Sequence, residues 1–545
     1  MTHFRSEPEP PVGITPVEHT GSATTREAPA PPTGHAPVND QRRAQLLLAS
    51  VMDRIGTNRC HKVILAIVVF GAFFDVIEQN TVGIVGPFLK EQWGVSSTGI
   101  GFLASATFGS MYVGAALAGW LSDLKGRKTM FNFNLALYSL GALVCALAPN
   151  FEVLVAGRVI VGLGLGGEFV VGLTLLAKMT STQFRGTAIS LLQVGAGGLG
   201  NPAAYLFGWV TVGMVGPHLP QFLGGPDAGW RWVFVLLCLP ALLVLYTRRH
   251  MPETPRYLVS KARTADANRS LSVLASGRMN PRGLVVTDYL PDGLRLTEEK
   301  ARWTEILKGR LGRNSAVLGS CTAALFGAQF VLLTFWPTIL VDRGYPVATS
   351  LAFTVIIFTG AVTGTLFATF LNTRCRRRPT IAVAAALSCA SALAFPFLAN
   401  GATAILVLGF LFEFFSWWAN CSISTWCPES YPTRVRAFGI GVISNLGMIG
   451  GALLPPVAGV LLGSMGSTVL LSLVAVVRGR PRGSPLRPRD LRPLAGGAAR
   501  RELTDTRSRS RQRGPTHAST TTGLDGTVRI GIDGVNDPGL KVNAA

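Results

Sequence analysis

The sequence predicts an all-α membrane protein whose chain crosses the bilayer many times. Of its 545 residues, 48% are hydrophobic, only 14% are charged and 62 are glycine, a composition unlike that of an ordinary soluble domain. Apolar runs long enough to cross about 30 Å of hydrocarbon recur along most of the chain. A basic loop between two of these runs returns in a degraded copy about 250 residues later. The repeat indicates two related halves.

Six apolar runs make up the first half of the chain. They cover residues 63–89, 98–121, 129–148, 152–177, 186–214 and 230–247. Five more runs follow a polar stretch and cover residues 315–341, 347–371, 380–399, 402–427 and 437–463. A twelfth run, Gly466 to Val477, is only a dozen residues long. Since a span needs roughly 17 residues, we expect the twelfth span to be truncated.

The polar segments divide the chain into five parts. Residues 1–60 are rich in proline and have no apolar period, which predicts a disordered cytoplasmic arm without a cleavable signal peptide. We expect a first bundle at 61–247, a cytoplasmic central loop at 248–314 and a second bundle at 315–477. Residues 478–545 predict a basic disordered tail. Its composition resembles translation in a shifted reading frame, which resequencing of the gene would test.

Basic residues gather in alternate loops and predict the orientation of the chain. Lys and Arg outnumber Asp and Glu by 50 to 29, a formal net charge of +21. The loops that contain Lys125, Lys178, Arg374 and Arg434 are basic, as is the central loop, whereas the loops between them are nearly uncharged. This alternation places the amino terminus in the cytoplasm. Because the charge follows topology and not one face of a folded domain, it argues against a nucleic-acid partner.

Cysteine and histidine positions predict neither a metal site nor a catalytic centre. The eight cysteines are scattered singly, without a C-x-x-C pair, and all seven histidines lie outside the apolar runs. An intramembrane enzyme needs a nucleophile with a base, or a set of metal ligands, at bilayer depth. The sequence therefore argues against an enzyme and against a bound cofactor.

The loop after the second run carries the most specific motif. Residues 119–128 read G-W-L-S-D-L-K-G-R-K. They resemble the signature loop G-x-L-x-D-x-x-G-R-K of the major facilitator superfamily, which implies two six-helix halves and secondary transport. The resemblance also implies a conformational latch, in which an acid meets helix ends and basic side chains of neighbouring spans. The latch candidates are Gly119, Asp123, Gly126, Arg127, Lys128, Arg185, Glu429, Arg434 and Arg436.

Three further motifs extend the resemblance over residues 60–475. Arg158 with the glycine run 162–167 resembles the R-x-x-x-G-x-G-x-G-G pattern of the sugar-porter and metabolite:proton-symporter branches. The same run fits a dinucleotide fingerprint, but inside an apolar segment small residues favour close helix packing instead. Residues 252–258 and 429–436 are similar to the sequences that follow the sixth and tenth spans in these branches.

The chain also departs from the family pattern. The second copy of the signature loop has Thr373 in place of Asp and Arg376 in place of Gly, and Lys178 stands where sugar porters carry a Glu. The charge pairs between the halves are therefore incomplete, and we expect a weaker gate on the cytoplasmic side.

Two acids in the first run are the main candidates for proton coupling. Asp75 and Glu78 are three residues apart and share one face of a helix, where each disfavours ionisation of the other. Each costs several kcal/mol in hydrocarbon unless it is paired or faces water. The pattern resembles the D-x-x-D of aromatic-acid:proton symporters, and Glu78 with Arg158 resembles the acid and arginine of proton-coupled sugar porters. The resemblance implies these three residues as the coupling site; the alternative is a polar bracket between helices.

Polar residues in other runs are candidates for substrate binding. They are Glu168, Gln193, Gln329, Trp417 and Asn420. Glu168 has structural alternatives, pairing with Arg158 in poor geometry or with another helix. The two glutamines lie where related sugar porters use amides, although a lone amide is more often helix glue. The sequence does not decide which way Asn420 and its neighbour Glu413 face. Tryptophan near a span end is usually an interfacial anchor, which we expect of Trp426.

These observations combine into a proton-coupled symporter of the plasma membrane. We expect a monomer that imports a small polar metabolite with protons by alternating access. Because Arg158 in an apolar cavity suits an anion, an organic acid is the first choice of substrate, and a sugar or phosphate is the second. A nutrient sensor with the same fold is the remaining alternative, and a measurement of coupled flux separates it from a transporter.

Overall fold

A computed structural model of the chain describes residues 37–221, 225, 228–279, 281, 283–294, 296, 308–375, 377–431 and 435–478. Within these residues all regular secondary structure is helical. Nine of the described helical segments are long and apolar enough to span a membrane. The prediction of an all-α multi-pass membrane protein is confirmed.

Six helical stretches occupy the places of the first six apolar runs. They are α2 (Arg59–Trp93), α3 (Ser97–Lys125), α4 (Arg127–Ala146), α5 (Phe151–Met179), the series α6 (Thr182–Gln193), η1 (Val194–Leu199), α7 (Gly200–Gly208), η2 (Trp209–Val215) and η3 (Gly216–His218), and the pair α8 (Gly229–Leu236) and α9 (Pro240–His250). The fifth stretch is irregular because η1 and η2 are π-helical. Such widened turns are rare and frequently mark functional sites.

Five long helices form the second half. They are α13 (Gly309–Asp342), α14 (Val347–Arg374), α15 (Arg377–Leu398), α16 (Ala402–Glu429) and α17 (Arg436–Arg478). The last helix continues without a turn through residues 466–477, so the short apolar run extends the eleventh span and does not return as a twelfth. A run of that length cannot recross the bilayer.

Polar residues in front of the apolar runs start the helices. The side chain of Asn58 accepts from the backbone N–H of Cys60 at 3.0 Å, and that of Asn150 accepts from Val153 at 3.0 Å. Ser96 caps α3 in the same way, through Gly99 N–H at 3.1 Å. These caps satisfy N–H groups that have no partner within their own helix.

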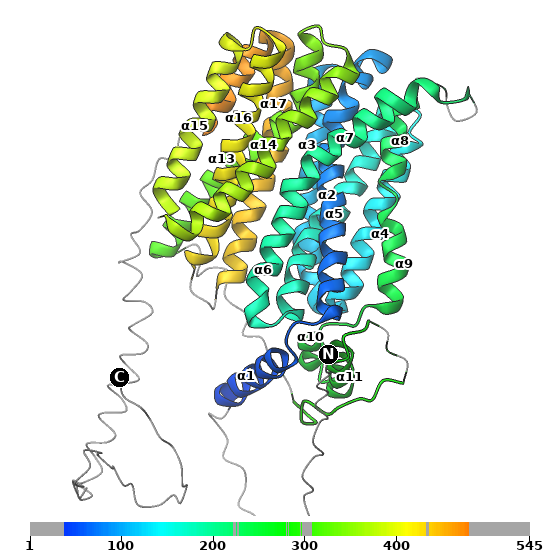
Figure 1. Ribbon diagram of the computed structural model, residues 1–545, viewed down its shortest axis with the longest axis vertical. Coiled ribbons are helices and arrows are strands. Elements are labelled where there is room, and N and C mark those ends of the chain that lie inside the picture. Colours follow the sequence, from blue (N-terminus) through cyan, green and yellow to red (C-terminus); the bar gives the residue numbers. More distant parts are fainter. Residues whose placement is uncertain are drawn as a thin grey trace, which may run out of the picture.

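Three short helices gather at one end of the bundle, which its basic loops assign to the cytoplasm (Figure 1). They are α1 (Pro37–Ile55), α10 (Pro255–Ser260) and α11 (Thr264–Ala275). The expectation of a disordered arm does not hold for α1, because its Ala44, Leu48, Val51 and Met52 form a helical stripe that is buried. Residues 1–36 of that arm and residues 479–545 of the tail lie outside the described residues.

The two halves lie side by side, α2 to α9 in one and α13 to α17 in the other (Figure 1). They approach closely toward the end opposite α1. At Gly101 the backbone of α3 lies against Pro455 of α17, so closely that any side chain there would collide. Tyr205 of α7 donates to the carbonyl of Leu333 in α13 at 2.6 Å. These contacts seal the bundle toward its outer end.

An ion pair bridges the halves at the outer rim. Lys90, in the last turn of α2, places its Nζ 2.7 Å from Oδ1 of Asp342, the last residue of α13. Both side chains remain partly exposed, at 43% and 37%. The pair therefore joins the first spans of the two halves where water reaches them.

Candidate functional site

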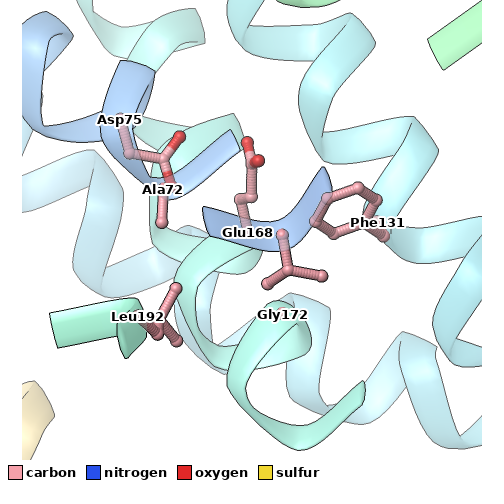
Figure 2. Close-up of a pocket in the computed structure, with 7 residues that line it drawn as sticks. Ala72, Asp75, Phe131, Glu168, Gly172 and Leu192 are labelled. Atoms are coloured by element: carbon pink, nitrogen blue, oxygen red, sulfur yellow. The ribbon is translucent and has the colours of Figure 1, made fainter. Parts of the chain in front are cut away.

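The two acids of α2 point to different partners. Asp75 lines a narrow gap together with Glu168 of α5, and the carboxyl groups point toward one another (Figure 2). Both side chains are 1% exposed. The rest of the gap is apolar and has no room for a water molecule; its lining is Val68, Ala72, Phe131, Gly172 and Leu192. Asp75 thus faces a second acid and not Glu78.

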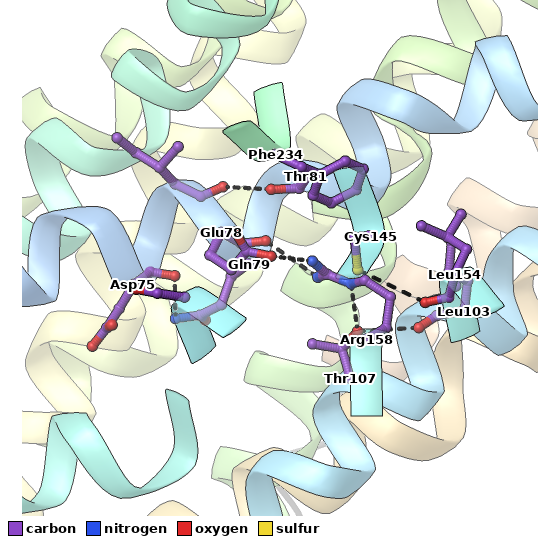
Figure 3. Close-up of polar contacts among 12 residues, drawn as sticks. Asp75, Glu78, Gln79, Thr81, Leu103, Thr107, Cys145, Leu154, Arg158 and Phe234 are labelled. Carbon is purple, nitrogen blue, oxygen red and sulfur yellow. Dashed lines mark hydrogen bonds and ion pairs between the residues drawn. The ribbon is translucent and has the colours of Figure 1, made fainter. Parts of the chain in front are cut away.

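Glu78 forms an ion pair with Arg158 of α5, and both side chains are fully buried (Figure 3). The guanidinium makes further hydrogen bonds: Nη2 donates to the backbone carbonyl of Glu78 at 3.2 Å and Nε donates to Oγ1 of Thr107 at 3.0 Å. Thr107 is held in turn by its donation to Leu103 O at 3.2 Å. Three helices, α2, α3 and α5, therefore fix the position of one positive charge.

Helix α4 adds two polar side chains beside the carboxyl pair. The Tyr138 hydroxyl and the Asn134 amide nitrogen are buried and have no hydrogen-bond partner among the described residues. A side chain on the neighbouring Gly167 would meet the Asn134 amide, which places this amide against α5 one residue before Glu168. The first half thus concentrates unpaired polar atoms around the two acids.

The second half has its own buried acid. Glu413 of α16 accepts from Gln329 Nε2 at 2.8 Å and from Trp336 Nε1 at 3.3 Å, both on α13. The three side chains are buried. Gln329, predicted as a substrate ligand, is therefore engaged with a carboxylate that the sequence had left unassigned, and Trp336 is an internal donor and not an interfacial anchor.

Trp417 of α16 reaches across to the first half. Its ring packs on Gly197 in the π-helical η1. This segment begins directly after Gln193, the last residue of α6. The Trp417 indole N–H and the Asn420 amide oxygen, one turn later on the same helix, are buried without partners among the described residues. Of the predicted substrate residues, Trp417 thus contacts the opposite half, at the segment that follows Gln193.

The signature loop is hydrogen-bonded to the segment after the sixth span. Glu253 Oε1 accepts from the backbone N–H of Arg127 and of Lys128, each at 3.2 Å, and so caps the start of α4. Gly126 has φ +96° and ψ 155°, a conformation that essentially only glycine adopts, and a side chain there would also collide with Glu253. The glycine permits both the turn and the cap.

The charged residues of the loop act within the first half. Arg127 donates to Asp123 Oδ1 at 3.1 Å and to the Thr174 hydroxyl of α5, while Asp123 remains 63% exposed. The Tyr257 hydroxyl donates to Leu124 O at 2.9 Å. Burial, and then the charge of Glu253, raise the pKa of Tyr257, so this hydroxyl remains a donor at neutral pH.

The remaining latch candidates are Gly119, Arg185, Glu429, Arg434 and Arg436. A side chain on Gly119 would meet no other atom within 4 Å, so no close contact accounts for that glycine. Glu429 is exposed at the end of α16. Arg185 in α6 and Arg436 at the start of α17 have side chains outside the described part of the chain, and Arg434 lies outside it altogether.

Six residues at the sites of the first half have no role predicted from the sequence: Thr107, Asn134, Tyr138, Thr174, Glu253 and Tyr257. The last two belong to the motif at 252–258, whose resemblance to family sequences does not reveal its contacts with the signature loop. The two threonines carry no sequence signal, because a hydroxyl in an apolar helix usually bonds to its own backbone.

Comparisons with known proteins agree with this architecture. Residues 68–455 match the Major Facilitator Superfamily. The niacin transporter NiaP of Acinetobacter baylyi is 29% identical over 408 residues, which cover 75% of this chain and 89% of that protein. The galactose-proton symporter of Escherichia coli K12 is 26% identical over 392 residues, 70% of this chain and 80% of that one.

Solved structures share the fold at low sequence identity. A D-xylose-proton symporter superposes with a TM-score of 0.60 at 17% identity, over 78% of this chain and 99% of that one. A bacterial homologue of the human lysosomal transporter Spinster, inward-facing and unoccupied, also gives 0.60, at 18% identity over 79% and 100% of the two chains. The chain therefore belongs to the Major Facilitator Superfamily and is a multi-pass transport protein of the plasma membrane, not an enzyme.

Proposed function

We propose that this protein imports a small organic anion together with protons, by alternating access between its two halves. The observation that carries the proposal is the fully buried ion pair of Glu78 and Arg158, on the first and fourth spans. Moving two charges into a membrane protein is costly and is repaid only by good geometry, so a charge pair at this depth favours a functional role. The cost also argues against the simple structural bracket.

The coupling follows from the fixed charge of Arg158. A guanidinium stays protonated at any physiological pH, so Arg158 needs a negative partner in every state of the cycle. Glu78 is that partner while it is ionised. Its Oε2 accepts no hydrogen bond from the described residues and is open to a proton. Once Glu78 is neutral, an anion can replace it at Arg158, so proton binding and anion binding favour one another.

The names of relatives support an acid as substrate. Besides the niacin transporter of Acinetobacter baylyi, a probable 4-methylmuconolactone transporter of Cupriavidus pinatubonensis is 24% identical over 382 residues. We assign the carboxylate of the substrate to Arg158 and the rest of the molecule to Gln193, Trp417 and Asn420. The indole ring suits a flat molecule, and the unpaired amide oxygen of Asn420 suits a donor on it.

A sugar is the second candidate. It is favoured by the galactose-proton symporter among the relatives and by the polar cluster of Gln329, Glu413 and Trp336, which resembles a hydroxyl-binding set more than an anion site. A carboxylate such as Glu413 repels an anion but can accept hydrogen bonds from a sugar, so the second half suits a sugar better than an anion. We further expect the transporter to be a monomer.

Uptake into proteoliposomes tests the proposal. Labelled nicotinate, galactose and phosphate are offered with and without an inward proton gradient, to the wild type and to Glu78→Gln. We expect the gradient to drive accumulation of nicotinate, and Glu78→Gln to abolish that accumulation. Glu91→Gln, which removes an exposed acid from the same helix, should transport as the wild type does.

The alternatives give different results. Gradient-driven uptake of galactose or phosphate alone would replace the organic anion by that substrate. Nicotinate uptake that ignores the gradient would remove proton coupling. Binding of nicotinate by folded protein, with no flux of any compound, would make the chain a sensor.

A further inference from the structure

The carboxyl pair of Asp75 and Glu168 is not explained by the coupling mechanism above. The two groups come from different helices, α2 and α5, and lie within hydrogen-bonding reach of each other. All four carboxylate oxygens are buried, and none accepts a hydrogen bond from a donor among the described residues. Two ionised carboxylates in contact would repel, whereas one protonated group can donate to the other.

The surroundings offer the pair no cation, so proton binding is the way in which its negative charge is reduced. The gap admits no water and is otherwise lined by apolar side chains and Gly172. The charged groups nearby are Glu78 on α2 and Arg158 on α5, which are bound to each other. From α4 come Tyr138 and Asn134, both uncharged, and the described lining side chain from α6 is Leu192. No described cation contacts either carboxyl group.

The position of the pair along the helices separates it from the ion pair. Asp75 is one turn nearer than Glu78 to the cytoplasmic start of α2. Glu168 is ten residues beyond Arg158 toward the cytoplasmic end of α5, which is about 15 Å at 1.5 Å per residue. The carboxyl pair thus lies between the ion pair and the cytoplasm.

We propose that Asp75 and Glu168 share a single proton between their facing oxygens and form a second proton site, on the cytoplasmic side of the Glu78–Arg158 pair. This inference rests on the proposed function for its place in a transport cycle, but not for the existence of the site. Glu168 then carries a proton and does not bind substrate. The proton partner of Asp75 is Glu168, not Glu78.

Infrared titration of the purified full-length protein tests the shared proton directly. Acids that share a proton titrate in two steps that belong to the pair, whereas independent acids titrate separately. We expect the wild type to show two carboxyl steps that are absent from the double variant Asp75→Asn/Glu168→Gln. Each single variant should show one step. The midpoint pH of that step should lie between the two midpoints of the wild type, about one unit or more from either.

Matched variants make this result interpretable. Glu168→Asp, which keeps both acids, should retain two steps, and Glu152→Gln, an exposed acid at the start of the same helix, should leave both steps unchanged. If each single variant removes one step and leaves the other where it was, the two acids are independent and the proposal is wrong.

Transport separates this proposal from the proposed function. Glu168→Gln should lose gradient-driven accumulation of nicotinate but keep exchange of labelled for unlabelled nicotinate, which needs no net proton movement. Loss of both would return Glu168 to substrate binding and overturn the proposal. If Asp75 and Glu168 titrate as a coupled pair but uptake by the wild type does not depend on the proton gradient, the shared proton stands and symport is refuted. If the two acids titrate independently but uptake depends on the gradient, symport stands and the shared proton is refuted.

Discussion

At the scale of single residues, one arginine determines how the acids of the first span are used. Arg158 binds both the side chain and the backbone carbonyl of Glu78, and its third nitrogen is fixed by Thr107. Asp75 is left to face Glu168. The spacing of three residues predicts a common face, but successive positions at this spacing diverge by about 60° around the helix axis. That angle is enough for the two acids to meet different neighbours.

Replacement of Arg158 by lysine tests the importance of its forked geometry. A single ammonium keeps the charge but cannot bond Thr107 and Glu78 in the same arrangement. Since hydrogen bonds to charged groups contribute about 1.5–3 kcal/mol, we expect Arg158→Lys to raise the KM for nicotinate about 10- to 100-fold.

Arg231→Lys provides the matched control for this measurement. Arg231 donates to the carbonyls of Ala146 and Ala148, away from the ion pair, so its replacement should leave the KM unchanged. An unchanged KM in Arg158→Lys would show that the anion binds elsewhere.

At the scale of elements, the signature loop and the segment after the sixth span form one unit. The carboxylate of Glu253 caps α4, and Tyr257 holds the end of α3. Arg127 connects the loop to α5 through Thr174. The segment that the sequence presents as a cytoplasmic loop is therefore bonded to the first bundle, through contacts between residues 126 apart in the chain.

The two glycines of the signature motif should respond differently to alanine. Gly126→Ala forces a side chain into a backbone conformation reserved for glycine and against Glu253. Strain of this kind costs on the order of 1–3 kcal/mol, so we expect a lower melting temperature and slower transport. Gly119→Ala adds a methyl group that meets nothing and should not lower stability. Equal melting temperatures for the two variants would contradict this account; the measurement is thermal unfolding in one detergent.

At the scale of the whole molecule, the halves are in contact toward the outer end, and Asp123 of the signature loop is largely exposed at the other. The outer end combines backbone contact at Gly101, the Tyr205 hydrogen bond and the Lys90–Asp342 ion pair. These contacts join the two halves at the outer end. The outward-facing state requires these contacts to separate.

Charge reversal at the outer rim should shift the balance between the two states. Lys90→Asp replaces attraction by repulsion, so we expect a larger outward-facing population, by up to about fivefold if the pair contributes about 1 kcal/mol. The swap Lys90→Asp/Asp342→Lys should restore the wild-type balance. Distances between spin labels on the outer ends of the first and seventh spans would measure the populations, and a swap that behaves like the single variant would exclude a direct ion pair.

The fold could be predicted from the sequence because hydrophobic length and loop charge determine it almost alone. The runs around α2 to α17, the signature loop and the acids of the first span are local patterns. Contacts across helices are not local. Glu168 facing Asp75, Gln329 bound to Glu413, and Trp417 on Gly197 depend on the rotation of each helix about its axis. In α5 and α16 apolar residues surround each polar one, so no amphipathic pattern reveals that rotation.

Because the ion pair between Lys90 and Asp342 is exposed, we expect the transporter to respond to the salinity of its surroundings. Dissolved ions screen charges over about 10 Å at 0.1 M and about 3 Å at 1 M, and both partners lie where bulk solution reaches them. The buried contacts beneath them are shielded from this effect. A cell in brine would thus hold more of its carriers open to the outside than the same cell in fresh water, before any substrate has bound.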